Sequence, residues 1–172
     1  REHPLETRVI EAKILFEVGN FEGASVILLD LVENARFQTQ TDYPKALFML
    51  GQSMRNMGNL RASARYLKKA IRLGEGKLKD KAQQQLIDMA LNDRDDERLR
   101  SIVDNVTESV QGQGSVKTRY ALGKALIRLE RYQEALTTLA KLREHPVLGN
   151  KSRYYWATAQ TALSRFDDAM AQ

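Results

Sequence analysis

Blocks of apolar and polar residues alternate along this chain at helical length, and short polar turns separate them. Five segments share one order: the end of a helix, a polar turn, an aromatic residue or leucine, and a helix with a small residue facing inward. They lie at residues 18–24, 57–64, 92–99, 129–135 and 163–169. No run of alternating β-branched residues is long enough to indicate a strand. The pattern therefore predicts consecutive helical hairpins.

The turns recur at a nearly constant distance along the chain. With Gly19, Gly58, Arg94, Glu130 and Ser164 taken as equivalent, the steps between them are 39, 36, 36 and 34 residues. The longer first step predicts an extended loop at residues 37–42, and the third copy matches the others least well. Periods of this size are typical of proteins built from stacked helical repeats.

Small residues stand at two fixed places around the turns. Seven residues before the turn position the chain has Ala12, Gly51, Gly123 and Ala157, with Ile87 as the exception. Five residues after it stand Ala24, Ser63, Ala135 and Ala169, with Leu99 as the exception. Because the distance between two helix axes depends on the side chains at the contact, we expect the two helices of each hairpin to approach closely.

These residues resemble the tetratricopeptide repeat family. Leu122, Gly123, Leu126, Tyr132, Ala135, Leu139 and Pro146 follow the family pattern, and Leu50-Gly51 and Trp156-Ala157 follow it in part. The resemblance implies an all-α fold, a right-handed α-solenoid of about four and a half tandem helix-turn-helix repeats in one domain over residues 1–172. The repeats are expected at 5–38, 44–77, 80–113 and 116–149, with an incomplete one at 150–172. Because no polar cap follows the last repeat, we expect a fragment of a longer protein, or an end that a partner covers.

Composition and charge narrow the possible functions. The 172 residues are 42% hydrophobic and 28% charged, which favours a soluble folded protein, and the net charge of +5 favours acidic partners. The absence of cysteine excludes disulfides, thiolate catalysis and cysteine-ligated zinc. Neither this absence nor the first residues assign a compartment, so the cytoplasm and a bacterial periplasm or cell envelope are both compatible.

Candidate chemistry is sparse. The two histidines, His3 and His145, have no partners at metal-ligand spacing. The segment Gly74-Glu75-Gly76-Lys77 lacks the first glycine and the final serine or threonine of a phosphate-binding loop, so we interpret it as a turn between repeats. The sequence therefore predicts no enzyme, no cofactor and no metal site.

In the family that the chain resembles, the first helix of each repeat lines a concave groove. The alignment places Val9, Lys13 and Phe16 there, and it gives these partner-binding candidates: Lys45, Phe48, Gln52, Arg55, Lys81, Lys117, Tyr120, Lys124, Arg128, Lys151 and Tyr154. One repeat position near helix N-termini, where the helix dipole disfavours cations, is occupied by Lys45, Lys81, Lys117 and Lys151. Three residues after the first, third and fourth of these lysines stand Phe48, Tyr120 and Tyr154. The family's carboxylate clamp is absent, because Val9, Lys13 and Met49 occupy its key positions.

We therefore predict a non-enzymatic scaffold, of the kind common in bacterial assemblies. It would bind an acidic peptide or helix with apolar anchors in the groove. The alternative for the lysines is that they are simply solvated, while the aromatic residues pack between repeats. An RNA-binding helical repeat is the alternative function, although the groove positions do not repeat as a base-reading code would require. A regulatory piece of an enzyme is the third hypothesis.

Overall fold

The computed structural model describes residues 4–170, with side chains described from residue 4 to residue 165. Within these residues every regular element is a helix, which confirms the expected all-α fold of tandem helical hairpins. The chain divides into two compact units, residues 1–82 and residues 83–172. The border falls inside one helix, and the two units are described separately.

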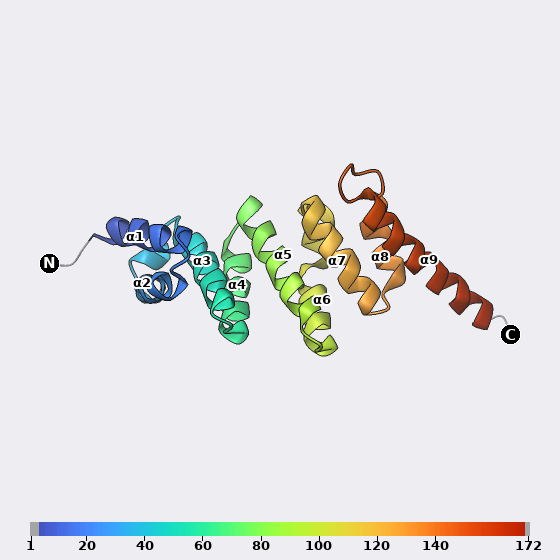
Figure 1. Cartoon of the computed structure of the whole chain (residues 1–172), viewed down its shortest axis with the longest axis horizontal. Coiled ribbons are helices and arrows are strands. Elements are labelled where there is room, and N and C mark those ends of the chain that lie inside the picture. The colour runs from blue at the N-terminus through green and yellow to red at the C-terminus, as the bar shows by residue number, and fades with distance from the viewer. Residues whose placement is uncertain (1–3, 171–172) are drawn as a thin grey trace. The chain divides into compact units, whose positions relative to one another are not determined.

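The first unit contains two helical hairpins in which each helix packs on the next (Figure 1). Its elements are α1 (Leu5–Glu17), α2 (Phe21–Glu33), the 3-10 helix η1 (Phe37–Thr39), α3 (Tyr43–Asn56), α4 (Leu60–Leu73) and the beginning of α5 (Gly76–Asn92). Leucines from α2, α3 and α4 fill the space between the helices, and Leu31, Leu50 and Leu67 are completely buried. The expected loop at residues 37–42 is present, and it includes η1.

The second unit continues the pattern. After the end of α5 it contains α6 (Asp96–Gln113), α7 (Val116–Arg128), α8 (Tyr132–Ala140) and α9 (Gly149–Met170). Consecutive helices from α6 to α9 pack on one another. α5 and α6 are the longest pair of helices that form one expected repeat. α5 also begins at Gly76, ahead of the expected start at residue 80.

Three of the turns share one backbone geometry. The central residue has a positive φ of 82° at Gly19, 79° at Gly58 and 59° at Glu130. In each turn, the next residue's amide donates to the carbonyl five residues earlier, an arrangement that closes a helix through a left-handed residue. These bonds join Asn20 to Leu15 at 2.9 Å, Asn59 to Met54 at 2.8 Å and Arg131 to Leu126 at 2.8 Å. The equivalence of these three turns is therefore confirmed.

The second helix of three hairpins begins with a side-chain cap at the same repeat position. The side chains of Asn20, Asn59 and Asp95 each accept a hydrogen bond from the backbone N–H three residues later, at 2.9, 3.1 and 2.9 Å. Such caps satisfy donors that a helix N-terminus leaves without partners. Asp95 thus confirms the alignment of the third repeat at this point, although Ile87 and Leu99 replace small residues within its helices.

Glu130 occupies a backbone conformation that glycine adopts in the first two hairpins, so a substitution there has a predictable effect. We expect Glu130→Gly to raise the free energy of unfolding by roughly 0.5–1 kcal/mol, because a Cβ atom is disfavoured at positive φ. Gly58→Ala should lower it by about 1 kcal/mol through the same backbone cost. No atom lies within 4 Å of a Cβ built on Gly58, so steric crowding does not contribute. Urea unfolding followed by circular dichroism measures both changes. A destabilised Glu130→Gly variant would contradict the conclusion that the positive φ of Glu130 costs stability.

The prediction for the fifth repeat is wrong at its turn. Residues 163–165 were expected to separate two helices, but α9 continues unbroken from Gly149 to Met170. Ser164 would have to take the left-handed conformation that disfavours side chains, whereas a continuous helix keeps its backbone hydrogen bonds. Ala157 is exposed as a result, while its counterparts Ala12, Gly51 and Gly123 are buried. The side chain of Ala169 lies outside the described residues.

Candidate functional site

A cavity of about 400 Å³ opens in the first unit, between the first helices of successive hairpins. α1 contributes Lys13, Phe16 and Glu17, α3 contributes Lys45, Phe48, Met49 and Gln52, and the first two turns of α5 contribute Lys77, Leu78 and Lys81. The sequence alignment placed Lys45, Phe48, Gln52 and Lys81 on one surface, together with Lys13 and Phe16. The structure brings these six residues together.

Apolar side chains form the floor of this cavity. Phe48 and Met49 are only 8% and 7% exposed, so both belong to the packed interior as well as to the cavity wall. Phe16 is half-buried, and its ring packs edge-on against Phe21 of α2 with 5.5 Å between centroids. Because these rings are fixed by packing, the cavity has an apolar surface that does not need to reorganise before a ligand binds.

Four lysines surround the apolar floor. Lys45, Lys77 and Lys81 are exposed and Lys13 is half-buried, and none of the four has an ion-pair partner in the described part of the chain. Glu17 is the single acidic residue of the lining. Lys45 stands in the first turn of α3, whereas Lys81 stands one turn further into α5, behind Lys77. The cavity therefore combines an apolar floor with a strongly cationic rim.

Four lining residues were not among the sequence candidates: Glu17, Met49, Lys77 and Leu78. Lys77 precedes Lys81 by four residues, so the two lie on one helix face. The predicted start of this helix at residue 80 excluded Lys77 and Leu78 from the face. Met49 follows the candidate Phe48 directly, and in the sequence it stood out only as a position of the missing carboxylate clamp. Arg55, by contrast, is an exposed candidate that lies outside the cavity lining.

The candidates of the second unit form an aromatic cluster rather than a cavity. Tyr155 of α9 packs edge-on against Tyr120 of α7 at 5.8 Å and against Tyr154 at 5.3 Å. The ammonium of Lys124 lies 5.3 Å from the centre of the Tyr120 ring, a cation–π distance. Burial raises the pKa of Tyr120, and the neighbouring Tyr155 adds to the shift. Tyr154 is 68% exposed and is available to a partner.

Arg128 has a structural role in the second unit. Its guanidinium donates hydrogen bonds to the carbonyls of Leu91 and Asp93, both at 2.8 Å, and to the carboxylate of Asp96 at 2.7 Å. These carbonyls lie at the end of α5, where a helix leaves acceptors without partners. The side chain therefore stabilises the turn between α5 and α6, and these contacts leave it less able to bind another molecule. The lysine candidates Lys117 and Lys151 are exposed.

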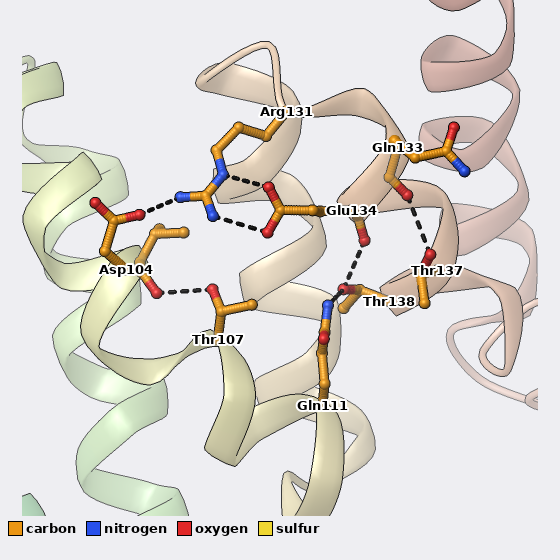
Figure 2. A network of polar contacts seen from close by, with 9 residues as sticks. Asp104, Thr107, Gln111, Arg131, Gln133, Glu134, Thr137 and Thr138 are labelled. Carbon is orange, nitrogen blue, oxygen red and sulfur yellow. Dashed lines mark hydrogen bonds and ion pairs between the residues drawn. The ribbon is translucent and has the colours of Figure 1, made fainter.

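A polar network joins α6 to α8 in the second unit (Figure 2). Arg131 donates two hydrogen bonds to Glu134, at 2.6 and 2.7 Å, and forms an ion pair with Asp104 of α6. The hydrogen bonds that Arg131 donates to Glu134 raise the pKa of Arg131, although burial opposes the shift. Gln111 donates to the hydroxyl of Thr138 at 2.9 Å. Arg131 stands where Asn20 and Asn59 cap the earlier helices, but its side chain makes no capping hydrogen bond and instead joins α8 to α6.

The described part of the chain contains neither a metal-binding cluster nor a membrane-spanning helix. No group of three or more histidine, cysteine, aspartate or glutamate residues there could hold a metal ion. His145 accepts hydrogen bonds from the amides of Val147 and Leu148 within its own turn, and His3 lies outside the described residues. No described helix is long and apolar enough to cross a membrane.

Comparison with known proteins agrees with the helical hairpin at the centre of the first unit. Residues 44–73 match the tetratricopeptide repeat family, and these residues comprise nearly all of α3 and α4. No curated protein matches the chain. The matched repeat supplies Lys45, Phe48, Met49 and Gln52 of the cavity. Residues 44–73 are thus a tetratricopeptide repeat, and the chain carries it within an array of similar helical hairpins.

Proposed function

We propose that this protein is a non-enzymatic scaffold that binds a partner protein within a multiprotein assembly. Tetratricopeptide repeats generally mediate protein–protein interaction. The observation that supports the proposal best is the cavity of the first unit, where four lysines surround an apolar floor. Its occupant would be a peptide or helix that inserts an apolar side chain between acidic residues.

The apolar floor and the lysines would have different roles in binding. Complete burial of a large apolar side chain contributes roughly 1.5–3 kcal/mol, so the floor would supply most of the affinity. The lysines, being largely exposed, would contribute less to affinity and more to the association rate and the choice of partner. The cavity volume also falls in the range of about 300–1,000 Å³ that is usual for ligand sites.

Within the second unit, Lys117, Lys124, Lys151 and Tyr154 are proposed as further partner contacts. Tyr154 has the exposure expected of an aromatic anchor, and the nearby lysines match the acidic partner inferred for the first unit. Arg55 belongs to the proposed surface as an exposed cation of α3, whereas Arg128 would influence binding only through the structure that it stabilises.

The test begins with selection of binding peptides from a random displayed library on the intact chain. We expect the selected peptides to carry Asp or Glu on both sides of a Leu, Ile, Met or Phe. Lys45→Glu combined with Lys81→Glu should weaken binding of a selected peptide at least about tenfold, as measured by fluorescence anisotropy, because it places like charges opposite each other. Arg36→Glu combined with Lys141→Glu is the matched control, since both residues are exposed and lie outside the cavity.

Two results would contradict the proposal. One is selection of peptides without acidic residues. The other is equal binding of the selected peptide by the wild type and by the Lys45→Glu/Lys81→Glu variant, once circular dichroism shows that both are folded. Tighter binding of a labelled RNA than of any selected peptide, with a steep fall as salt rises, would instead support the nucleic-acid alternative.

A further inference from the structure

The outward face of α4 is uniformly cationic. Helical geometry places five basic residues within one arc, opposite the buried Ala64, Leu67 and Ala70. The five are Arg61, Arg65, Lys68, Lys69 and Arg72, and all of them are exposed. From the first to the last they extend about 16 Å along the helix, at 1.5 Å for each residue. This surface is distinct from the lysine-rimmed cavity, to which α4 contributes no residue.

Nothing within α4 balances these charges. No acidic residue occurs between Leu60 and Leu73, and none of the five cations forms an ion pair among the described residues. Arg61 and Arg65, Arg65 and Lys69, and Lys68 and Arg72 are like-charge pairs at a spacing of four residues. Each such pair destabilises a helix by roughly 0.2–0.5 kcal/mol. An exposed face that serves only solubility usually mixes the two signs, and this one does not.

A second cavity, of about 360 Å³, adjoins this face inside the first unit. Arg65, Tyr66 and Lys69 of α4 form one side, and Tyr43 of α3 and Glu33 of α2 lie among the other lining residues. Arg65 is held in place, because its guanidinium donates to the hydroxyl of the buried Tyr66 at 2.9 Å and lies 4.8 Å from the centre of that ring. A side chain of a molecule lying along α4 would therefore meet an ordered cation at the cavity mouth.

The surroundings of this face select among anionic partners. Glu33 of α2, which is exposed and lines the same cavity as Arg65 and Lys69, would repel a bilayer or a long phosphate backbone that spread sideways over this side of α4. None of the five residues on the cationic face is aromatic, so a base would find no ring to stack on. Leu73, 45% exposed, stands at the end of α4 beside this face and offers an apolar contact, whereas Leu60 lies on the side of the buried Leu67. A narrow acidic helix with an apolar residue near its end matches this pattern best.

We propose that α4 is a second docking surface, which binds an acidic helical segment of a partner protein along its length. Glutamates at a spacing of three and four residues would face the cations of α4, which have the same spacing. This surface is separate from the cavity proposed above for a peptide with an apolar anchor. The scaffold would then hold two different segments on two faces of one tetratricopeptide repeat.

The probe for this surface is a capped, fluorescein-labelled helical peptide with glutamates along one face and a leucine near one end. Its control is the same peptide with glutamine in place of every glutamate. We expect Arg61→Glu combined with Lys68→Glu to weaken binding of the glutamate peptide about tenfold or more in fluorescence anisotropy at moderate salt. Lys45→Glu combined with Lys81→Glu should change it by less than about twofold, because those lysines line the other cavity.

Several outcomes would overturn the proposal. They are no binding of the glutamate peptide, equal binding of the glutamine peptide, and unchanged binding by the folded Arg61→Glu/Lys68→Glu variant. Loss of binding only in the Lys45→Glu/Lys81→Glu variant would place the peptide in the first cavity instead. A duplex oligonucleotide or anionic vesicles that bind more tightly than the peptide, and depend on Arg61 and Lys68, would identify a different partner class. The proposed function is tested by other variants and peptides, so either proposal could fail alone.

Discussion

Replacing Gly123 with valine should lower the free energy of unfolding by about 3 kcal/mol, at the upper end of the usual cost of overpacking. A Cβ atom at Gly123 would lie 2.6 Å from the Cγ atom of Leu139 in α8, well inside van der Waals contact. Leu139 is completely buried, so any shift of its side chain displaces the atoms packed around it. α7 and α8 would have to separate, which would disturb the packing of the whole hairpin. Urea unfolding followed by the fluorescence of Trp156, the single tryptophan of the chain, measures the change in this unit.

Two further variants test whether close approach of the helices is the cause. Gly112→Ala in α6 should keep or raise stability by up to about 1 kcal/mol, since alanine favours helix and no atom lies within 4 Å of the new Cβ. Adding Leu139→Ala to Gly123→Val should cost less than the sum of the two single changes, because valine would occupy part of the space that Leu139 leaves. Strict additivity, or a Gly123→Val variant as stable as the wild type, would show that this contact does not set the spacing of the hairpin.

The column of small residues that contains Gly123 was visible in the sequence, because the buried Ala12, Gly51 and Gly123 must each admit a second helix at close range, although the exposed Ala157 need not. The repeated turns were visible for a similar reason. A left-handed residue followed by a capping residue leaves the local signature Gly19-Asn20 and Gly58-Asn59, and these features depend on neighbouring residues alone. Local requirements of this kind predicted the fold class and the turns at Gly19, Gly58 and Glu130.

The candidate site was predicted only in part, because it depends on contacts between distant residues. Spacing along the helices placed Lys45, Phe48, Gln52 and Lys81 on one surface, and the cavity contains all four. The same reasoning could not show that Arg128 would find three acceptors around the turn between α5 and α6. A helical pattern tells which face a cation occupies, whereas its partners depend on where the other helices lie. The cations of α4 were missed because the family resemblance directs attention to the first helix of each repeat.

Phe37 is another residue whose environment depends on contacts that the sequence did not reveal. Its substitution has the largest expected effect on the free energy of unfolding. The sequence placed it at the start of a loop, where side chains are usually exposed. In the structure its ring is completely buried and packs edge-on against Tyr43, with 6.1 Å between centroids. η1 holds it there, because the Phe37 amide donates to the carbonyl of Asn34 at 3.0 Å. The long loop is therefore part of the packed interior that joins α2 to α3.

Phe37→Ala should lower the free energy of unfolding by about 4 kcal/mol, since it removes a buried ring and leaves a cavity that the adjoining helices fill only partly. Phe37→Leu should cost much less, and Val147→Ala, at a residue that is 77% exposed, should cost almost nothing. Urea unfolding measures these changes, and hydrogen exchange should show the greatest loss of protection at the start of α3. Because Lys45 stands in that turn, Phe37→Ala should also weaken binding of a selected peptide to the first cavity. Unchanged exchange in α3 would mean that the loop does not position this lysine.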